Sequence, residues 1–235
     1  MNLKGKNIII TGGSLGIGKA TAKTLIEKGA NVLVTGRSRK RLVSAFIDDK
    51  VNIIEFDIGD IENISINAKR CLEILDNKVD VLINNAGIGV RKSIEELDIE
   101  SFLDVFNVNV FGLALFTRNI IPVMKQKKYG TIVNIGSTAS LKGYKNGSIY
   151  SSSKFAVRCL TQCWQSELRS YNIRVCQVNP SEVTTAFGNL ERIEREEVHN
   201  KLTPNEISHA IASAIEMDDR GFINELNIWA TNPFS

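Results

Sequence analysis

The chain has 235 residues, of which 43% are hydrophobic and 23% are charged, and its formal net charge is +3 at pH 7. This length is enough for one domain with a large core, and the composition is that of an ordinary soluble globular protein. The small net charge and the dispersed basic residues argue against a nucleic-acid partner. We therefore expect a single domain over residues 1–235.

The cysteines and the N-terminus bear on the location of the protein. Four cysteines, at positions 71, 159, 163 and 176, form no CxxC pair and have no neighbouring histidine, so we expect no metal site and no disulfides. Cys159 and Cys163 share one helix face, and we expect them to be small packing residues. Residues 1–6 contain no signal-peptide core, and no apolar run approaches the ~20 residues of a membrane span. These features favour a cytoplasmic protein without a membrane segment.

Short apolar runs alternate with longer amphipathic segments along the chain. The first run, residues 7–11, precedes a helix predicted over residues 17–28. The other predicted strands cover residues 31–35, 53–56, 79–83, 130–135, 174–178 and 225–229. A long helix is expected over residues 100–127, kinked or interrupted near its end by Pro122. Apolar strands separated by helices predict a parallel sheet covered on both faces, which is an α/β, Rossmann-type, doubly wound fold with about seven strands.

A glycine-rich turn, Thr11-Gly-Gly-Ser-Leu-Gly16-Ile-Gly18, joins the first strand to the first helix. Glycine lets the backbone approach a diphosphate closely, and the free N–H groups at a helix N-terminus favour an anion. The GxxxGxG spacing of Gly12, Gly16 and Gly18 differs from the GxGxxG fingerprint. The turn indicates a dinucleotide site, with a purely structural tight turn as the alternative.

The end of the second strand indicates which dinucleotide is bound. An acidic residue there would bind the ribose 2′-OH of NAD, whereas arginine accepts the 2′-phosphate of NADP. The sequence runs Gly36-Arg37-Ser38-Arg39-Lys40, with no carboxylate and three cationic side chains that we expect to cluster around a phosphate. This favours NADP(H) over NAD(H); the alternative is a basic loop that caps the sheet.

Tyr150 and Lys154 lie four residues apart, and Ser137 precedes Tyr150 by thirteen residues. On a helix this spacing places the pair on one face, where the ammonium would lower the pKa of the phenol from its usual ~10. A phenol tuned in this way, next to a serine hydroxyl, can exchange a proton with an alcohol or a carbonyl. Taken alone, the pair is also what a solvated helix surface would show.

In combination, these motifs resemble the short-chain dehydrogenase/reductase family, in its compact oxidoreductase branch, over nearly the whole chain. The resemblance rests on the order of several motifs. They are the glycine turn, Asp57 after the third strand, Asn84-Asn85-Ala86-Gly87 after the fourth, Asn109 in Asn-Val-Phe-Gly, Ser137 after the fifth, and Tyr150-x3-Lys154. Each motif is weak singly, but the ordered set is highly specific.

The resemblance implies a role for each catalytic candidate. Tyr150 would be the general acid in reduction and the base in oxidation, while Lys154 would lower its pKa and hold the nicotinamide ribose. Ser137 would hydrogen-bond the substrate oxygen, unless it only caps the strand end and a neighbouring hydroxyl takes this role. Asn109 would hold a water that links Lys154 to solvent, or would simply bond helix backbone.

The cofactor-binding residues that the resemblance implies are spread along the chain. They are Gly12, Ser14, Leu15, Gly16, Ile17, Gly18, Arg37, Ser38, Asp57, Ile58, Asn85, Ala86, Gly87, Tyr150, Lys154, Pro180, Val183 and Thr185. Asp57 and Ile58 would flank the adenine, and a helix N-cap is an alternative or additional role for Asp57. The family pattern implies no metal.

Two positions depart from the family pattern. Ser181 stands where relatives commonly carry glycine, which adds a hydroxyl beside the expected nicotinamide. Leu15 stands where many NADP-using relatives carry a basic residue, which places phosphate recognition on Arg37 and its neighbours. The charged segment after Thr185 is expected to form a small lid or a solvated helix.

The leading hypothesis is an NADP(H)-dependent carbonyl reductase that also runs as an alcohol dehydrogenase. The alternatives are a catalytically inactive dinucleotide-sensing protein of the same fold and an NAD-linked alcohol dehydrogenase. The resemblance also implies a homodimer or homotetramer, through an apolar face that could equally be core. That face comprises Phe102, Val105, Phe106, Val110 and Leu113. The expected walls of the substrate pocket are Ile88, Val90, Arg91, Ala139, Ser140, Leu141, Tyr144 and Ser181.

Overall fold

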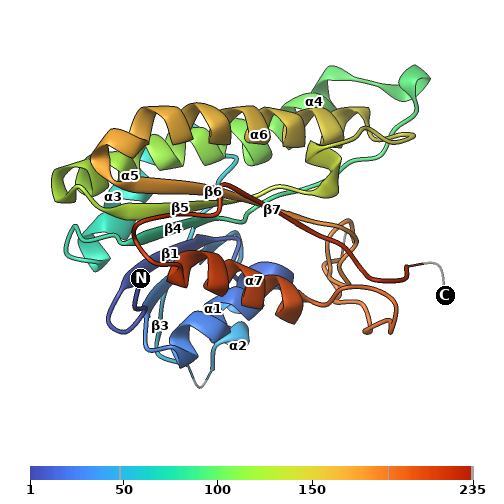
Figure 1. The fold of residues 1–235 in the computed structure, drawn as a ribbon. Coiled ribbons are helices and arrows are strands. Elements are labelled where there is room, and N and C mark those ends of the chain that lie inside the picture. Colours follow the sequence, from blue (N-terminus) through green and yellow to red (C-terminus); the bar gives the residue numbers. More distant parts are fainter. Residues whose placement is uncertain (48, 190, 234–235) are drawn as a thin grey trace.

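The computed structural model describes residues 1–47, 49–189 and 191–233. Within them, one seven-stranded parallel sheet has the strand order β3-β2-β1-β4-β5-β6-β7 (Figure 1). The strands are β1 (Asn7–Thr11), β2 (Asn31–Gly36), β3 (Val51–Glu55), β4 (Val81–Asn84), β5 (Gly130–Ile135), β6 (Ile173–Pro180) and β7 (Glu225–Ile228). The winding direction reverses between β1 and β4. The predicted doubly wound α/β fold is confirmed.

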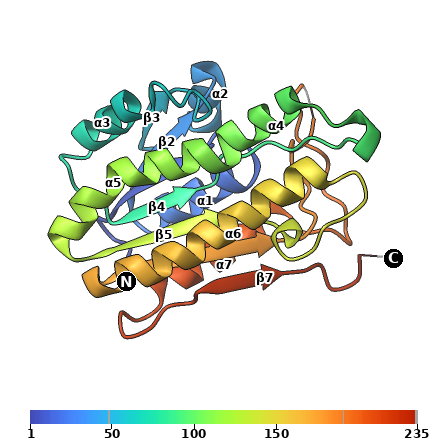
Figure 2. The same ribbon diagram turned by 90° about the horizontal axis from the view of Figure 1, so that it is seen from above.

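Helices cover both faces of the sheet. Below it in Figure 1 lie α1 (Gly16–Glu27), α2 (Arg39–Ala45) and α7 (Pro204–Glu216). Above it lie α3 (Ile64–Ile74), α4 (Ile99–Phe106), α5 (Leu113–Lys127) and α6 (Ser148–Leu168). Short 3₁₀ turns occur at Ile94–Glu96, Thr138–Ser140 and Arg169–Tyr171. Figure 2 shows α5 and α6 running side by side across the upper face.

Strand β1 shows why the strand sequences are apolar throughout. Ile8 and Ile10 pack into the core formed with α1 and α7, whereas Ile9 packs into the core formed with α3 and α5. All three side chains are fully buried. Because helices cover both faces of the sheet, neither face of the strand meets solvent. Polar residues therefore do not alternate with apolar ones along its sequence.

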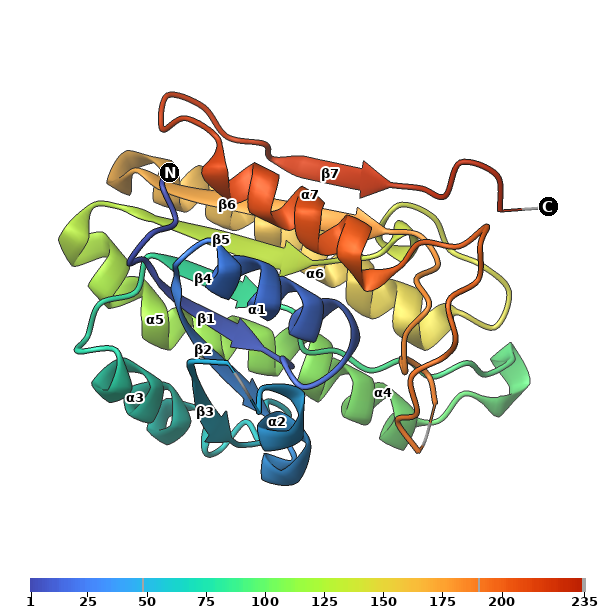
Figure 3. The ribbon, with the colours of Figure 1, turned by 90° about the horizontal axis from the view of Figure 1, so that it is seen from below.

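The first and last helices pack against each other below the sheet (Figure 3). The hydroxyls of Thr24 in α1 and Ser208 in α7 are 3.0 Å apart. At the ends of the two helices, the ammonium of Lys28 donates to the carboxylate of Glu216 at 3.0 Å. Elements from opposite ends of the chain therefore complete one core together.

The predicted strand positions are confirmed, with shifts at their boundaries. β1 and β5 have the predicted bounds, whereas β4 begins at Val81 rather than at residue 79. Asp80, immediately before β4, is buried and accepts a hydrogen bond from the backbone N–H of Asn7 at 2.9 Å. The backbone of Asp80 also pairs on both sides, since its N–H donates to Asn7 and its carbonyl oxygen accepts from Thr131. β6 runs two residues further than predicted, to Pro180.

The expected interruption of the long helix near Pro122 was wrong. α5 passes through Pro122 and ends at Lys127, and the change in helix geometry lies earlier, in a π-helical segment at Asn107–Gly112. A π segment inserts an extra residue into the turn and is often found at functional sites. Here the segment contains Asn109, which is buried.

The same helical region corrects the expectation that no apolar run is long enough to span a membrane. By length and composition, residues Ile99–Lys127 pass that test, with a mean hydropathy of 1.5 over 18 residues. The fully buried Phe116, Ile120 and Met124 of α5 pack against the sheet. Core helices of soluble proteins pass the same test, so this single helix is weak evidence for a membrane location.

The expected packing role of two cysteines was also wrong. Cys159 and Cys163 are exposed on α6, whereas Cys71 and Cys176 are buried. All four are free thiols. The shared helix face was correctly predicted from the four-residue spacing, but that spacing does not indicate which face points inward.

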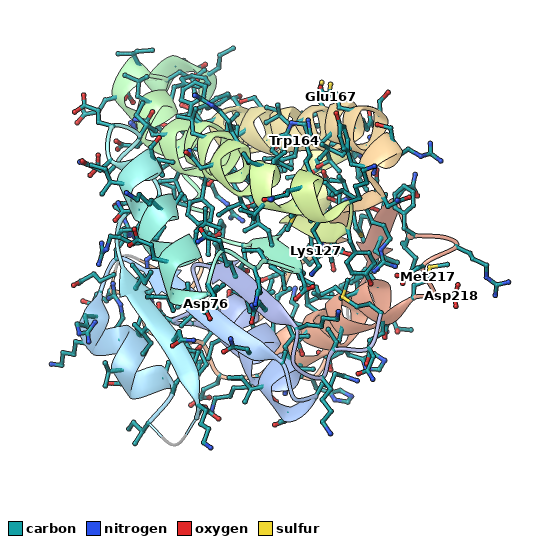
Figure 4. All side chains as sticks on the ribbon, turned by 90° about the vertical axis from the view of Figure 1, so that its left-hand side faces the viewer. Asp76, Lys127, Trp164, Glu167, Met217 and Asp218 are labelled. Carbon is teal, nitrogen blue, oxygen red and sulfur yellow. The ribbon has the colours of Figure 1, made fainter. Side chains whose placement is uncertain are left out.

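Polar contacts tie the end of the molecule at which the strands begin (Figure 4). Lys127, at the end of α5, pairs with the buried Asp80. Arg174 in β6 donates to the carbonyl oxygen of Met217, just after α7, at 2.9 Å. Lys127 and Met217 are both labelled in Figure 4. These contacts join the elements around the amino ends of the strands. The carboxyl ends of the strands lie at the other end of the molecule.

Candidate active site

A cavity of about 1250 Å³ lies at the carboxyl ends of the strands. It includes the point between β1 and β4 at which the winding reverses, where open α/β sheets bind their ligands. The connection from β6 to α7, orange in Figure 1, forms part of its wall. The predicted cofactor-binding residues that line it are Gly12, Ser14, Leu15, Gly16, Ile17, Arg37, Asp57, Ile58, Asn85, Ala86, Gly87, Tyr150, Lys154, Pro180, Val183 and Thr185.

The glycine turn forms one wall of this cavity by close approach of the backbone. Gly12 has a φ of +69°, and a Cβ built on it would lie 2.8 Å from the Cα of Ala86. Asn85 fixes the opposite loop, because its side-chain amide donates to the carbonyl oxygens of Thr11 and Gly12 at 3.0 and 2.9 Å. Gly18 does not line the cavity and lies behind the turn, against Gly12 and Asn85.

The basic residues after β2 divide between the cavity and the surface. Arg37 lines the cavity and lies 3.8 Å from the carboxylate of Asp57, at the end of β3. Arg41 lines it too, although the sequence analysis did not select it. Arg39 and Lys40 are not part of the lining, so the expected cluster of three consecutive cations was wrong. The short helix α2 begins at Arg39. Within its first turn residue 41 lines the cavity, whereas residues 39 and 40 do not.

Ser38 and Asp57 have local structural partners. Ser38 is the N-cap of α2, and its hydroxyl accepts from the backbone N–H of Arg41 at 3.3 Å. It does not line the cavity, and its predicted cofactor contact stays a prediction. Asp57 accepts from the backbone N–H of Gly59 at 2.8 Å. It is not a helix N-cap, because Asn63 occupies that position in α3.

Ser137, Tyr150 and Lys154 come together at the other end of the cavity. Ser137 follows β5, and Tyr150 and Lys154 lie one turn apart in the first half of α6. The Lys154 ammonium is buried, donates to the carbonyl oxygen of Ile135 at 2.7 Å, and lies 5.8 Å from the centre of the Tyr150 ring. The sequence spacing thus brought the three side chains into one site.

The protonation of this site differs from the expectation in one respect. Burial raises the pKa of Tyr150 to about 12, and its hydrogen bond with Ser137 opposes the rise only in part. Burial also lowers the pKa of Lys154 to about 8. The expected lowering of the tyrosine pKa by Lys154 is therefore not met here, because burial dominates. Tyr150 consequently holds its proton at neutral pH and is a hydrogen-bond donor.

Ser137 has the capping role that the sequence left open, and it also lines the cavity. It caps the 3₁₀ turn Thr138–Ser140, and its hydroxyl accepts from the backbone N–H of Ala139 at 3.1 Å while facing the cavity. Ser140 points the other way: it is fully buried and accepts from the backbone N–H of Ser137. Ser140 is therefore not a competing cavity hydroxyl.

Asn109 lies behind the cavity and is not part of its lining. Its side-chain amide donates to the carbonyl oxygen of Ile88 at 2.9 Å and to the Ser153 hydroxyl at 3.0 Å, and its Oδ1 accepts from the N–H of Ile88 at 2.9 Å. The loop after β4 is thereby fixed to α6 by one buried side chain. The alternative that Asn109 bonds helix backbone was wrong, because the backbone that it bonds is that of Ile88 in this loop.

The end of β6 is tied to the residues after β7. The hydroxyl of Ser181 accepts from the backbone N–H of Ala230 at 3.3 Å, so the extra hydroxyl of this residue has a structural partner. Val183 and Thr185 are buried and line the cavity. The charged segment that follows contains no helix among its described residues, so the expectation of a solvated helix was wrong.

The walls at the mouth of the cavity were predicted in part. Ile88, Val90, Arg91, Ala139, Tyr144 and Ser181 line the cavity, whereas Ser140 and Leu141 do not. Two aromatic residues were missed: Phe187, whose ring centre lies 5.5 Å from that of Tyr150, and Trp229. Neither belongs to a recognisable motif, because each reaches the site through a connection of irregular structure.

Replacing Lys154 with methionine is expected to stabilise the protein at pH 7 by roughly 2 kcal/mol, since it removes a buried charge. The lysine pKa falls from 10.5 unfolded to about 8 folded, so between these values the unfolded chain binds more protons and stability rises with pH. The advantage of Lys154→Met should therefore shrink from pH 8 to pH 10. Urea denaturation measures it. An advantage that is constant over this range, or that Lys142→Met reproduces, would contradict the assignment.

Comparisons with known proteins agree with this geometry. A family model described as short chain dehydrogenase matches residues 6–196. An uncharacterized oxidoreductase of Staphylococcus saprophyticus is 30% identical over 235 residues, covering 97% of this chain and 98% of that protein. The 3-ketodihydrosphingosine reductase of Mus musculus is 32% identical over 196 residues, covering 78% of this chain and 58% of that protein.

Solved structures show the same architecture. The X-ray structure of an alcohol dehydrogenase from the archaeon Thermococcus sibiricus, complexed with 5-hydroxy-NADP, superposes with a TM-score of 0.89 at 27% identity and covers 97% of each chain. The family model accounts for most of the sequence, and the superposition covers nearly all of the fold. The chain belongs to the short-chain dehydrogenase family of oxidoreductases.

Proposed function

We propose that the protein is an NADP(H)-dependent oxidoreductase that transfers hydride between the nicotinamide and a carbonyl or alcohol substrate. The observation that carries this proposal is the meeting of Ser137, Tyr150 and Lys154 in one cavity with a glycine turn and two arginines. The cavity thus combines groups that handle a proton with groups that suit an anionic dinucleotide.

The lining residues fit a nicotinamide dinucleotide phosphate. The glycine at position 12 lets the turn pack closely against the Ala86 loop, and the turn leads into the N-terminus of α1, which favours a diphosphate. Arg37 and Arg41 would hold the 2′-phosphate, and Lys154 would hold the nicotinamide ribose. When bound, the dinucleotide supplies or accepts the hydride, and the protein provides orientation and proton transfer.

In the proposed reduction, Tyr150 gives its proton to the carbonyl oxygen. The raised pKa, about 12, keeps the phenol protonated at neutral pH, so that Tyr150 has a proton to give. Ser137 donates a second hydrogen bond to the same oxygen and stabilises the charge that develops there. Asn109 acts through the backbone of Ile88 and through Ser153, which places it as a positioning residue. Its additional role in holding a water stays a prediction.

The relatives support this class of reaction. One is named as a reductase of 3-ketodihydrosphingosine, and another is an alcohol dehydrogenase crystallised with 5-hydroxy-NADP. A dinucleotide-sensing protein without activity is the alternative, and the presence of both Tyr150 and Lys154 disfavours it. A panel of ketones, aldehydes and alcohols, assayed by the absorbance of NADPH, separates the two. Tight NADPH binding with no turnover on any compound would favour the sensor.

Replacing Arg37 with aspartate is expected to reverse the cofactor preference. The change removes a cation from the proposed phosphate site and adds a carboxylate that suits the 2′-OH of NAD. We expect the ratio of the NADH and NADPH dissociation constants to fall by about 100-fold, since a charged hydrogen bond is lost and a repulsion gained. Fluorescence titration with each cofactor measures it. An unchanged ratio would count against the NADP(H) assignment.

We also propose that residues 1–235 act as one cytoplasmic domain that assembles as a homodimer or homotetramer. Four free cysteines suit a reducing compartment. Val105, Val110 and Leu113 of the expected interface are buried within the protomer and belong to its core. The neighbouring Leu103 and Phe111 are exposed and better suit a subunit contact. Size-exclusion chromatography with light scattering gives the assembly state.

A further inference from the structure

The arginines that line the cavity include a group of three from two distant parts of the chain. Arg37 follows β2, Arg41 lies in the first turn of α2, and Arg192 lies in the connection between β6 and α7. The first two are close in sequence and form the phosphate site proposed above. Arg192 belongs to neither a family motif nor a helix or strand. The reaction proposed above assigns it no role.

The charges around these arginines do not balance. Asp57 lies 3.8 Å from Arg37, but neither Arg41 nor Arg192 has a carboxylate within 4 Å among the described residues. Three guanidinium groups and one carboxylate leave a surplus of two positive charges. Partial burial, followed by the charges of Arg37 and Arg41, lowers the pKa of Arg192 from its usual value. The arginines therefore repel one another until an anion lies between them.

The segment that carries Arg192 is anchored on both sides of the cavity. The guanidinium of Arg195 donates to the carbonyl oxygens of Val183 and Thr185 at 2.9 and 3.1 Å, which ties the segment to the end of β6. The carboxylate of Glu194 accepts from the backbone N–H of Gly16 at 3.0 Å, which ties it to the start of α1. These contacts hold the segment against the cavity that Arg37 and Arg41 also line.

We propose that Arg192 is a specificity-determining residue that binds the 2′-phosphate of NADP(H) together with Arg37 and Arg41. This inference rests on the NADP(H) function proposed above. A phosphate monoester carries a charge of about −1.5 to −2 at pH 7, which matches the surplus of two, and guanidinium groups bind its oxygens in a planar, bidentate manner.

The proposal also implies that the protein discriminates against NAD(H). The Glu194 carboxylate lies at the N-terminus of α1, the position that a diphosphate favours, so both dinucleotides meet its negative charge. Only the cofactor with a 2′-phosphate gains an attraction to Arg192 on the same segment. The cation of the segment, Arg192, therefore favours binding of NADP(H). Its anion, Glu194, disfavours binding of both cofactors alike.

The test compares binding of 2′,5′-ADP and 5′-ADP by calorimetry, because these probes differ in the 2′-phosphate and need no catalysis. Arg192→Ala is expected to lower the affinity for 2′,5′-ADP by about tenfold, because one charged hydrogen bond is lost. It should change the affinity for 5′-ADP by less than about twofold. Arg192→Lys should retain part of the affinity, since the charge remains. The matched control is Arg39→Ala, which removes a nearby cation outside the lining and should change neither affinity.

Two results would overturn the proposal. An equal loss of affinity for both probes would mean that Arg192 only supports the structure of the segment. No loss of affinity for either probe would mean that Arg192 does not bind the phosphate. Arg37→Ala in the same assay separates this failure from that of the proposed function. If Arg37→Ala abolishes the preference and Arg192→Ala does not, only the inference on Arg192 fails. If the unmodified protein binds both probes equally, the NADP(H) assignment fails as well.

Discussion

Replacing Tyr150 with phenylalanine is expected to lower the rate of carbonyl reduction by about 10³-fold, within the range observed when a general acid is lost. The change removes one oxygen and leaves the ring that packs against Phe187. Binding of NADPH should stay within about twofold, since the phenol hydroxyl contributes little to an interaction dominated by the phosphates. Single-turnover measurement of NADPH oxidation gives the rate, and fluorescence titration gives the affinity.

A second tyrosine of the cavity serves as the control. Tyr144 lines the mouth and is exposed, and its ring lies 5.8 Å from the guanidinium of Arg91. Tyr144→Phe makes the same chemical change away from Ser137 and Lys154 and should reduce the rate by only a few-fold. Turnover that survives in Tyr150→Phe with every active substrate would show that another group supplies the proton.

Replacing Gly112 with alanine is expected to lower the free energy of unfolding by about 3 kcal/mol or more, at the upper end of what overpacking costs. A Cβ at this position would lie 2.0 Å from the carbonyl oxygen of Ile58 and 2.8 Å from that of Asn107. Both obstacles are backbone atoms, so no side chain can move aside. Urea denaturation measures the loss. Activity should fall with it, because the same π-helical segment carries Asn109.

Gly221 provides the matched control for this substitution. The nearest atom to a Cβ built there is the terminal methyl carbon of Met217, at 3.4 Å, which is an ordinary contact. Gly221→Ala should therefore change the free energy of unfolding by no more than about 0.5 kcal/mol. Similar losses in the two variants would mean that the close approach of Gly112 to Ile58 does not limit stability.

The sheet was predictable because its signal is local and repeated. Each strand is a short apolar run, such as the residues around Ile9, and the helices between the runs allow only a parallel arrangement. The boundaries were less predictable, because they depend on tertiary partners. Asp80, one residue before β4, finds the partner of its carboxylate in the N–H of Asn7, which lies 73 residues earlier in the chain.

The site was predictable where its residues belong to spaced motifs. The four-residue spacing of Tyr150 and Lys154 and the glycine turn both specify geometry directly. Roles that depend on burial were not predictable: the sequence suggested a lowered pKa for Tyr150, whereas its enclosure raises it. Arg192 was noted only as part of a charged segment, since nothing in its local sequence places it beside Arg37.

The contact between α1 and α7 has a consequence for synthesis of the chain on the ribosome. The face of α1 that Ser208 contacts in the folded protein stays uncovered until α7 has been made, and 184 residues separate Thr24 from Ser208. The apolar side chains of β1 that face α1 and α7 lack the same partner until then. This core is therefore expected to form only once α7 is available and not vectorially from the N-terminus, leaving a long interval in which a nascent chain is open to chaperones.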